Sequence, residues 1–141
     1  MESSVAAVAV QSDGRMVAAG YVTNVDGGSD FALVRYRTNG RLDEGFGDDG
    51  KVVTDFSEGY DQANGVAVQS DGRIVAAGFS SWNDGTAFAL ARYTPDGHLD
   101  ESFGNAGKVL ASFSGVADID ATKATVQADG RIVVAGRVAN V

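Results

Sequence analysis

One string of thirteen residues occurs almost unchanged at two places in the chain, and a close variant occurs at a third. It reads VAVQSDGRMVAAG at residues 8–20, VAVQSDGRIVAAG at 66–78 and TVQADGRIVVAG at 125–136. The glutamines that open the three turns, Gln11, Gln69 and Gln127, follow one another at intervals of 58 residues. A chain of 141 residues with this period is built from copies of one supersecondary unit.

The second half of the unit repeats as well. FALVRYRTNGRLDEGFGDDGKVVTDFS at residues 31–57 corresponds to FALARYTPDGHLDESFGNAGKVLASFS at 88–114, with an offset of 57. The changes of length between copies fall in loops, where the backbone tolerates them. We therefore expect a single repeat array over residues 1–141, with a first repeat at about 5–62, a second at about 63–120 and a partial third at about 121–141.

Each copy contains short strand signals. Alternating apolar residues on both sides of Asp13-Gly14, Asp71-Gly72 and Asp129-Gly130 predict the same tight hairpin three times, because glycine accepts a positive φ without steric cost. FALVRY and FALARY predict a third strand with two largely apolar faces. GKVVTDF and GKVLASF indicate either an outer fourth strand or a connection to the next unit.

These signals favour an all-β fold. No segment has a helical period with caps, and the chain contains 19 glycines and one proline. Sheets with two apolar faces must be covered on both sides, which small four-stranded units achieve by stacking around an axis. We expect a β-propeller type of repeat with four-stranded antiparallel blades, about two and a half of them in this chain. A β-solenoid is the alternative, and a duplicated β-sandwich is less favoured.

The repeats resemble a known family. VAVQSDGRIVAAG followed by FALARYTPDGHLDESFGNAGKV is similar to the delta-60 repeats, which are bacterial tandem repeats regarded as propeller-like and without a defined activity. The likeness covers essentially the whole chain, with departures at Arg41, at His98 and in ADIDATKATVQ. It implies a piece of a longer exported or surface-associated protein, so an extracellular or cell-surface location is favoured over the cytoplasm.

Composition excludes several partners. Nineteen acidic residues against eleven basic ones give a net charge of −8, which repels phosphate backbones, so we expect no nucleic-acid partner. The chain has no cysteine and therefore no disulfide framework. No apolar run approaches the length of a membrane span, and the start MESSVAAVAV has an acidic residue where a signal peptide carries basic ones.

Two charged pairs recur in the repeats. Arg35 lies on the apolar strand one turn before Asp43, and Arg92 stands in the same relation to Asp100. We expect each pair to meet inside its blade as a structural ion pair that fixes strand register. An anion site around a central channel is the functional alternative.

The sequence offers little for catalysis or metal binding. FGDDGK suggests calcium, but its second copy FGNAGK lacks both carboxylates, which favours a glycine-rich turn. The single histidine, His98, occupies a turn position where the first copy has Arg41. Without a nucleophile–base pair, a ligand cluster or a phosphate loop, we expect no catalytic residue, no metal, no cofactor and no enzyme activity.

The least repetitive loops, YVTNVDGGSD and FSSWNDGTA, carry the best candidates for contact with a ligand or partner. A large aromatic in a polar loop is typical of sugar-binding and partner-binding sites, although the same loops can vary without function. The candidates are Trp82, Asn83, Asp84, Asn24 and Asp26.

Two classes of function remain open. The first is a non-enzymatic scaffold or protein-interaction module within a larger or oligomeric assembly, and the second is a lectin-like propeller that binds a small ligand. GRVANV at residues 136–141 aligns with GYVTNV at 20–25, so the sequence stops within a third blade. A ring needs about four to eight blades. We therefore expect either a fragment of a longer repeat protein or a symmetric homo-oligomer.

Overall fold

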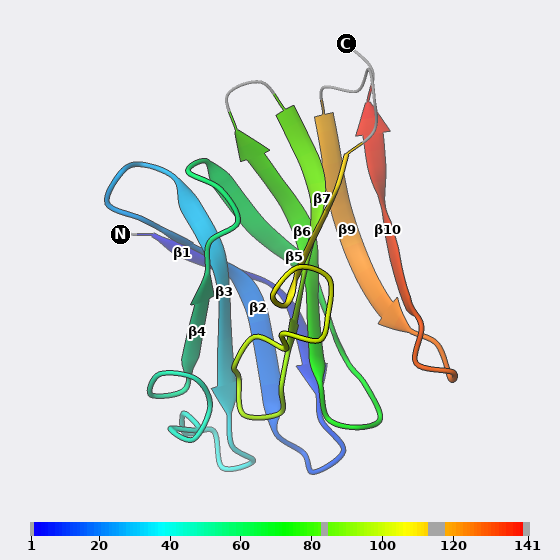
Figure 1. Cartoon of the computed structure of the whole chain (residues 1–141). Helices are drawn as coiled ribbons and strands as arrows, with labels where there is room; N and C mark the ends of the chain where they lie inside the picture. The colour runs from blue at the N-terminus through cyan, green and yellow to red at the C-terminus, as the bar shows by residue number, and fades with distance from the viewer. Residues whose placement is uncertain (1, 83–84, 113–117, 140–141) are drawn as a thin grey trace.

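The first repeat folds into a four-stranded antiparallel blade. A computed structural model describes residues 2–82, 85–112 and 118–139, and this part of the chain contains ten strands and no helix (Figure 1). Blade 1 consists of β1 (Ser3–Val10), β2 (Met16–Thr23), β3 (Ser29–Tyr36) and β4 (Lys51–Thr54), paired in chain order. GKVVTDF therefore contains an outer strand, which settles the choice that the sequence left open.

The second repeat builds the same unit. Blade 2 consists of β5 (Tyr60–Val68), β6 (Ile74–Trp82), β7 (Gly85–Tyr93) and β8 (Lys108–Ala111). A third hairpin follows, formed by β9 (Asp118–Val126) and β10 (Ile132–Ala139). A single parallel pairing, Ser29 with Tyr60, links the sheets of the two blades.

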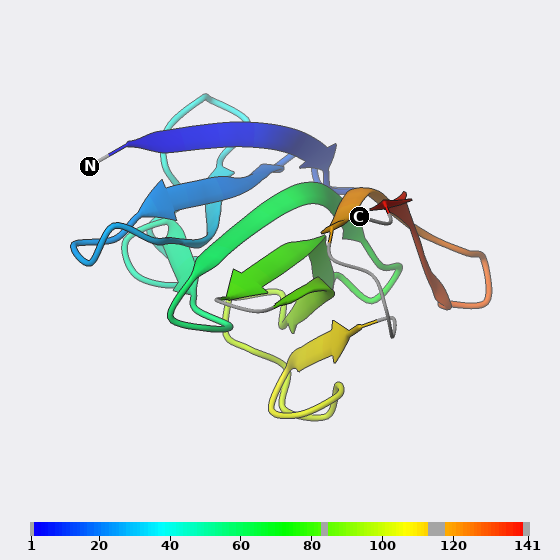
Figure 2. The same ribbon diagram turned by 90° about the horizontal axis from the view of Figure 1, so that it is seen from above.

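The units stack in series and do not close into a ring. β5 lies against β1, β2 and β3 of blade 1, and β9 lies against β5, β6 and β7 of blade 2. Viewed from above, β1 runs along an outer side of the molecule, with no further strand beyond it in the part that the structure describes (Figure 2). The fold is thus all-β and of the propeller type, as the sequence predicted.

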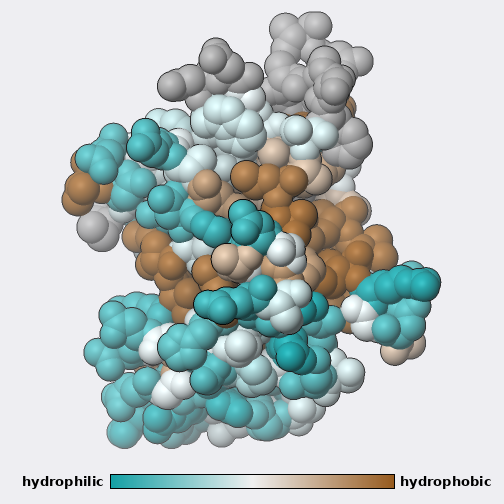
Figure 3. Space-filling model, viewed as in Figure 1, coloured by the Kyte–Doolittle hydropathy of each residue, from teal (hydrophilic) through white to brown (hydrophobic). Residues whose placement is uncertain are grey.

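The hydrophobic core lies between blades 1 and 2. Blade 1 contributes Val17, Phe31 and Leu33 from one face of its sheet, and blade 2 contributes Ile74 and Tyr93 from the face opposite, all fully buried. Alternate residues of each strand point to opposite faces, so every blade presents two surfaces that need cover. Hydrophobic residues accordingly form a band across the middle of the molecule, while hydrophilic loops gather at the lower end in the view of Figure 3.

The repeated Asp-Gly turns share one geometry. Gly14, Gly72 and Gly130 all have positive φ, between 83° and 85°. In the second copy the Asp71 carboxylate accepts a hydrogen bond from the backbone N–H of Arg73 at 3.0 Å. Glycine therefore supplies the left-handed backbone and aspartate holds the residue after the glycine, which explains why both residues recur.

Candidate functional site

A cavity opens between the two blades, at the end opposite the Asp-Gly turns. It has a volume of about 650 Å³. Its walls come from three segments: the β2–β3 loop of blade 1, the connection from β4 to β5, and the end of β6. The lining residues are Asp26, Gly27, Gly28, Glu58, Gly59, Tyr60, Ser81 and Trp82.

Close-packed backbone forms one side of this cavity. A Cβ built on Gly28 would lie 2.2 Å from the Gly59 carbonyl oxygen, and one on Gly59 would lie 1.8 Å from the Ser81 carbonyl oxygen. The backbone N–H of Ser29 also donates to the Gly59 carbonyl at 3.1 Å. Side chains at these two glycine positions would push the three segments apart, so the cavity depends on glycine there.

Asn24 braces the loop without lining the cavity. Its backbone N–H donates to the Gly28 carbonyl at 3.0 Å, and its side-chain oxygen accepts from the Gly28 N–H at 2.8 Å. Its side-chain nitrogen donates to the Asp30 carboxylate at 3.3 Å. Of the two candidates on this loop, Asp26 therefore reaches the cavity and Asn24 positions the loop that carries it.

Two aromatic side chains stand at the cavity. Trp82 is 41% exposed and Tyr60 is 55% exposed, so both rings can contact a ligand from the solvent. The Trp82 indole lies over Gly85, its cross-strand neighbour on β7. The structure thus brings Trp82 to the same cavity as Asp26, while Asn83 and Asp84 lie outside the described residues.

Three carboxylates gather on segments that adjoin those of the cavity lining. Oxygens of Asp30, Asp55 and Asp61 all lie within 4.8 Å of one another. Burial raises the pKa of both Asp30 and Asp61, and the charge of Asp55 raises both further. Asp61 is fully buried and accepts hydrogen bonds from the backbone N–H groups of Phe56 and Ser57 at 2.5 and 3.2 Å. These contacts give Asp61 a structural role in holding the connection from β4 to β5.

The repeated charged pairs lie elsewhere, near the opposite end of the blades. Arg35 Nε is 2.8 Å from an oxygen of Asp43, and Arg92 Nε is 2.8 Å from an oxygen of Asp100. Both guanidinium groups also stack on a phenylalanine, with Arg35 Cζ 4.4 Å from the centre of the Phe46 ring. Arg35 further donates to the backbone carbonyl of Pro95 in blade 2.

The surroundings of the two aspartates keep both ionised. A hydrogen bond from Arg15, aided by Arg35 and Arg37, lowers the pKa of Asp43 to about 2. Hydrogen bonds from Ser102, aided by Arg92, lower the pKa of Asp100 to about 2. Such groups are poor proton donors and acceptors near neutral pH, so this arrangement suits structural pairing better than acid–base chemistry.

The remaining sequence candidates occupy turns. In FGDDGK, the backbone N–H of Asp48 donates to the Lys51 carbonyl at 2.8 Å, and Asp49 has a positive φ of 47°. His98 has a 73% exposed side chain, and its Nε2 lies 3.9 Å from an oxygen of Asp96. Neither segment contributes to the carboxylate cluster that the structure brings together in its described part.

Several cavity residues escaped the sequence analysis. Glu58, Gly59 and Tyr60 lie at the junction between the blades, outside the two variable loops. Two members of the acidic cluster carry a signal in the sequence, because Asp30 aligns with Ala87 and Asp55 with Ser112. Acidic residues that occur in one copy only are better candidates for a site than those that every copy shares.

The comparisons with known proteins agree with this architecture. The fold defines a propeller-type repeat protein. A family described as "Domain of unknown function (DUF5122) beta-propeller" matches residues 11–46 and 69–103, which together make up half of the chain. The chain belongs to this β-propeller repeat family. No curated protein matches it.

Proposed function

We propose that the chain is a non-enzymatic propeller-type scaffold that associates with further blades of its own kind. The observation that carries this proposal is an uncovered apolar face on blade 1. We call it the free face and define it by Val5, Val8 and Val10 of β1 together with Val34 and Tyr36 of β3. The three β1 valines are 62%, 59% and 67% exposed.

Blade 2 shows what normally covers such a face. The equivalents of Val5, Val8 and Val10 are Ala63, Val66 and Val68. Ala63 is fully buried and the two valines pack against the core between the blades. The same strand is thus covered in blade 2 and open in blade 1, and an open apolar face of this kind favours association.

A second copy of the chain offers a fitting surface. Val133 of β10 is 42% exposed, whereas its equivalents Val17 and Val75 are fully buried. Val17 belongs to the blade 1 surface on which blade 2 packs. The Val133 surface of one copy and the free face of another would therefore repeat the contact between blades 1 and 2, in a head-to-tail interface.

The absence of enzyme activity is part of this proposal. The charged residues that recur, Arg35 with Asp43 and Arg92 with Asp100, are engaged in pairs within their own blades. We also propose that the repeats are of the delta-60 type, which the length of the shared motif supports.

Light scattering over a range of protein concentrations tests the assembly. We expect a mass above that of one chain, falling on dilution. The double variant Val8→Lys with Val10→Lys and the single variant Val133→Lys should each lose self-association, because either variant places charge on one side of the interface. Val25→Lys is the control, since Val25 is 88% exposed on a loop outside both surfaces.

Mixing the two interface variants sharpens the test. Each retains one intact surface, so the mixture should form a complex of two chains and no larger species. A wild-type chain that stays monomeric at every concentration, or a mixture that forms no complex, contradicts the proposal.

A second candidate function is lectin-like binding of a small ligand, which the cavity lined by Trp82 and Asp26 favours. A glycan array tests it. Selective binding that Trp82→Ala abolishes would support this candidate, and an array without selective signals would count against it.

A further inference from the structure

The cavity between the blades has negative charge that the described chain leaves unbalanced. Asp26 and Glu58 are exposed at its lining and make no ion pair or side-chain hydrogen bond with the described residues. The cation that the structure ties to these loops is Lys108, whose Nζ donates to the Asp55 backbone carbonyl at 3.0 Å and lies 5.6 Å from the Phe56 ring. Lys108 does not line the cavity.

Further carboxylates strengthen this field. Asp30 and Asp61 lie near the starts of β3 and β5, and Asp55 lies in the connection that carries Glu58; together they form the carboxylate cluster. Like charges at such short range repel one another, and the burial of Asp61 limits the screening that water and salt provide there. A positively charged ligand in the cavity would relieve this repulsion.

The aromatic lining suits the same kind of ligand. The faces of tryptophan and tyrosine carry partial negative charge and attract cations, particularly alkylated ammonium groups. Trp82 and Tyr60 are both partly exposed at the cavity. A neutral ligand would contact the rings but leave the carboxylates partly desolvated and unpaired, which is unfavourable.

We propose that this cavity binds a small organic cation through an alkylammonium group, with Asp26 and Glu58 as counter-charges and Trp82 as an aromatic contact surface. The inference rests on the second candidate function, ligand binding at this cavity, and specifies a cation as the ligand class.

Trp82 provides the readout, because it is the one tryptophan in the sequence and its emission reports on the cavity directly. Choline is the probe, titrated at constant ionic strength. Its uncharged isostere 3,3-dimethylbutan-1-ol, in which carbon replaces the ammonium nitrogen, is the matched ligand control. We expect a saturable change in emission with choline and affinity for the isostere weaker by about fivefold or more.

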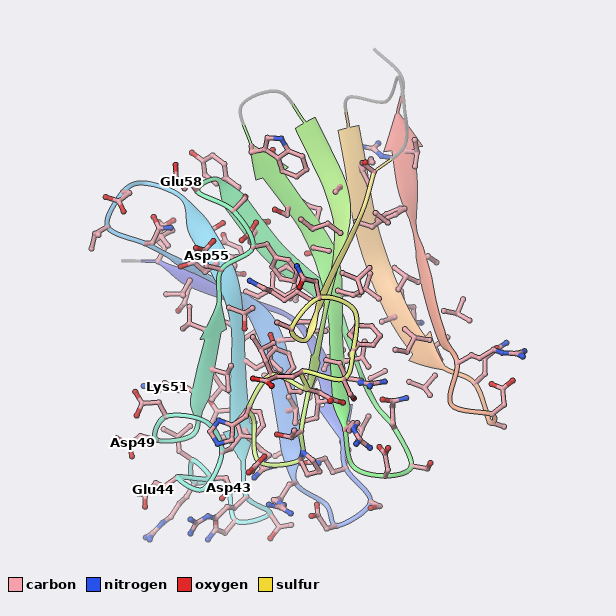
Figure 4. The ribbon with its side chains drawn as sticks, in the orientation of Figure 1. Asp43, Glu44, Asp49, Lys51, Asp55 and Glu58 are labelled. Atoms are coloured by element: carbon pink, nitrogen blue, oxygen red, sulfur yellow. The ribbon has the colours of Figure 1, made fainter. Side chains whose placement is uncertain are left out.

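Variants that remove charge without changing shape locate the site. Glu58→Gln and Asp26→Asn should each weaken choline binding by about threefold or more, given what an exposed counter-charge contributes. Glu44→Gln is the matched control, because Glu44 lies at the opposite end of the molecule from Glu58 (Figure 4). It should bind choline as the wild-type chain does.

Each other result overturns the inference. No response to choline, an equal response to the isostere, or unchanged binding in both charge variants would each do so. Calcium that displaces choline with higher affinity would make the acidic cluster a metal site instead. Selective glycan binding without choline binding would support ligand binding at this cavity. It would contradict the inference that the ligand is a cation. Self-association is measured separately, so the scaffold proposal is unaffected by these outcomes.

Discussion

Blades 1 and 2 have nearly the same third strand but bury opposite faces of it. In β3, Phe31 and Leu33 are fully buried while Tyr36 on the other face is half-buried. In β7, Leu90 is half-buried while Tyr93 on the other face is fully buried. At the third strand the two blades therefore cover complementary faces, because the β9–β10 hairpin lies against blade 2 but leaves Leu90 only half-buried.

The difference teaches that burial in this fold is assigned by the neighbouring unit. The leucine face of blade 1 meets the tyrosine face of blade 2, and this contact holds most of the core. A blade of one sheet has little interior of its own, so its stability depends on how many of its faces are covered. Substitutions at equivalent positions should accordingly have unequal effects.

The largest expected difference concerns the two leucines. Leu33→Ala should destabilise the fold by about 3 kcal/mol, because it removes a fully buried side chain and leaves a cavity between the blades. Leu90→Ala should cost about half as much, since Leu90 is only partly covered. Urea denaturation of both variants measures this. Equal losses would show that the blades have equivalent environments.

A smaller difference is expected at the tyrosines. The Tyr93 hydroxyl lies 2.8 Å from Thr54 Oγ1 of β4, so a buried hydrogen bond links the two blades. Tyr93→Phe should cost about 1 kcal/mol by leaving the Thr54 hydroxyl without this partner, whereas Tyr36→Phe should cost close to nothing. Thermal unfolding distinguishes the two. A larger loss at Tyr36 would reverse the assignment of covered faces.

The smallest effect concerns the ion pairs Arg35–Asp43 and Arg92–Asp100, because each blade has one. The pKa values of Asp43 and Asp100 are both about 2, below the ordinary value of 3.8. A carboxylate with a lower pKa in the folded state stabilises that state above its unfolded pKa, and this contribution disappears as the pH falls towards 2. Urea midpoints should therefore drop between about pH 4 and pH 2.

The double variant Asp43→Asn with Asp100→Asn should flatten that drop. Asp61→Asn is the control: burial raises the pKa of Asp61, so its protonation favours the folded state and its linkage to pH has the opposite sign. The control should retain the acid-side drop, and a drop that persists in the double variant would assign it to other carboxylates.

The architecture could be predicted from the sequence because each repeat carries local signals for it. The Asp-Gly turns and the two-faced third strand each have a local cause, namely the φ of Gly72 and the alternation from Phe31 to Tyr36. Local causes of this kind can be recognised in the sequence without knowing which surface packs against the strand. Hence the blades, the hairpins and the propeller class could all be predicted.

The cavity could be predicted only in part. Trp82 and Asp26 stood out because their loops differ between copies, and both line it. Glu58 and Tyr60 lie in a connection whose path depends on how Gly59 packs against Ser81. That close approach arises from tertiary contact between blades, and no periodicity within one copy encodes it.

The order in which the units cover one another has a consequence for how the chain acquires its structure. β5 packs against strands of blade 1, which precede it in the sequence, and β9 packs in the same way against strands of blade 2. During synthesis from the N-terminus, β5 and β9 would each emerge after the strands of the blade on which they pack. We therefore expect the chain to fold as repeat arrays do, by propagation from one docked pair of units to the next.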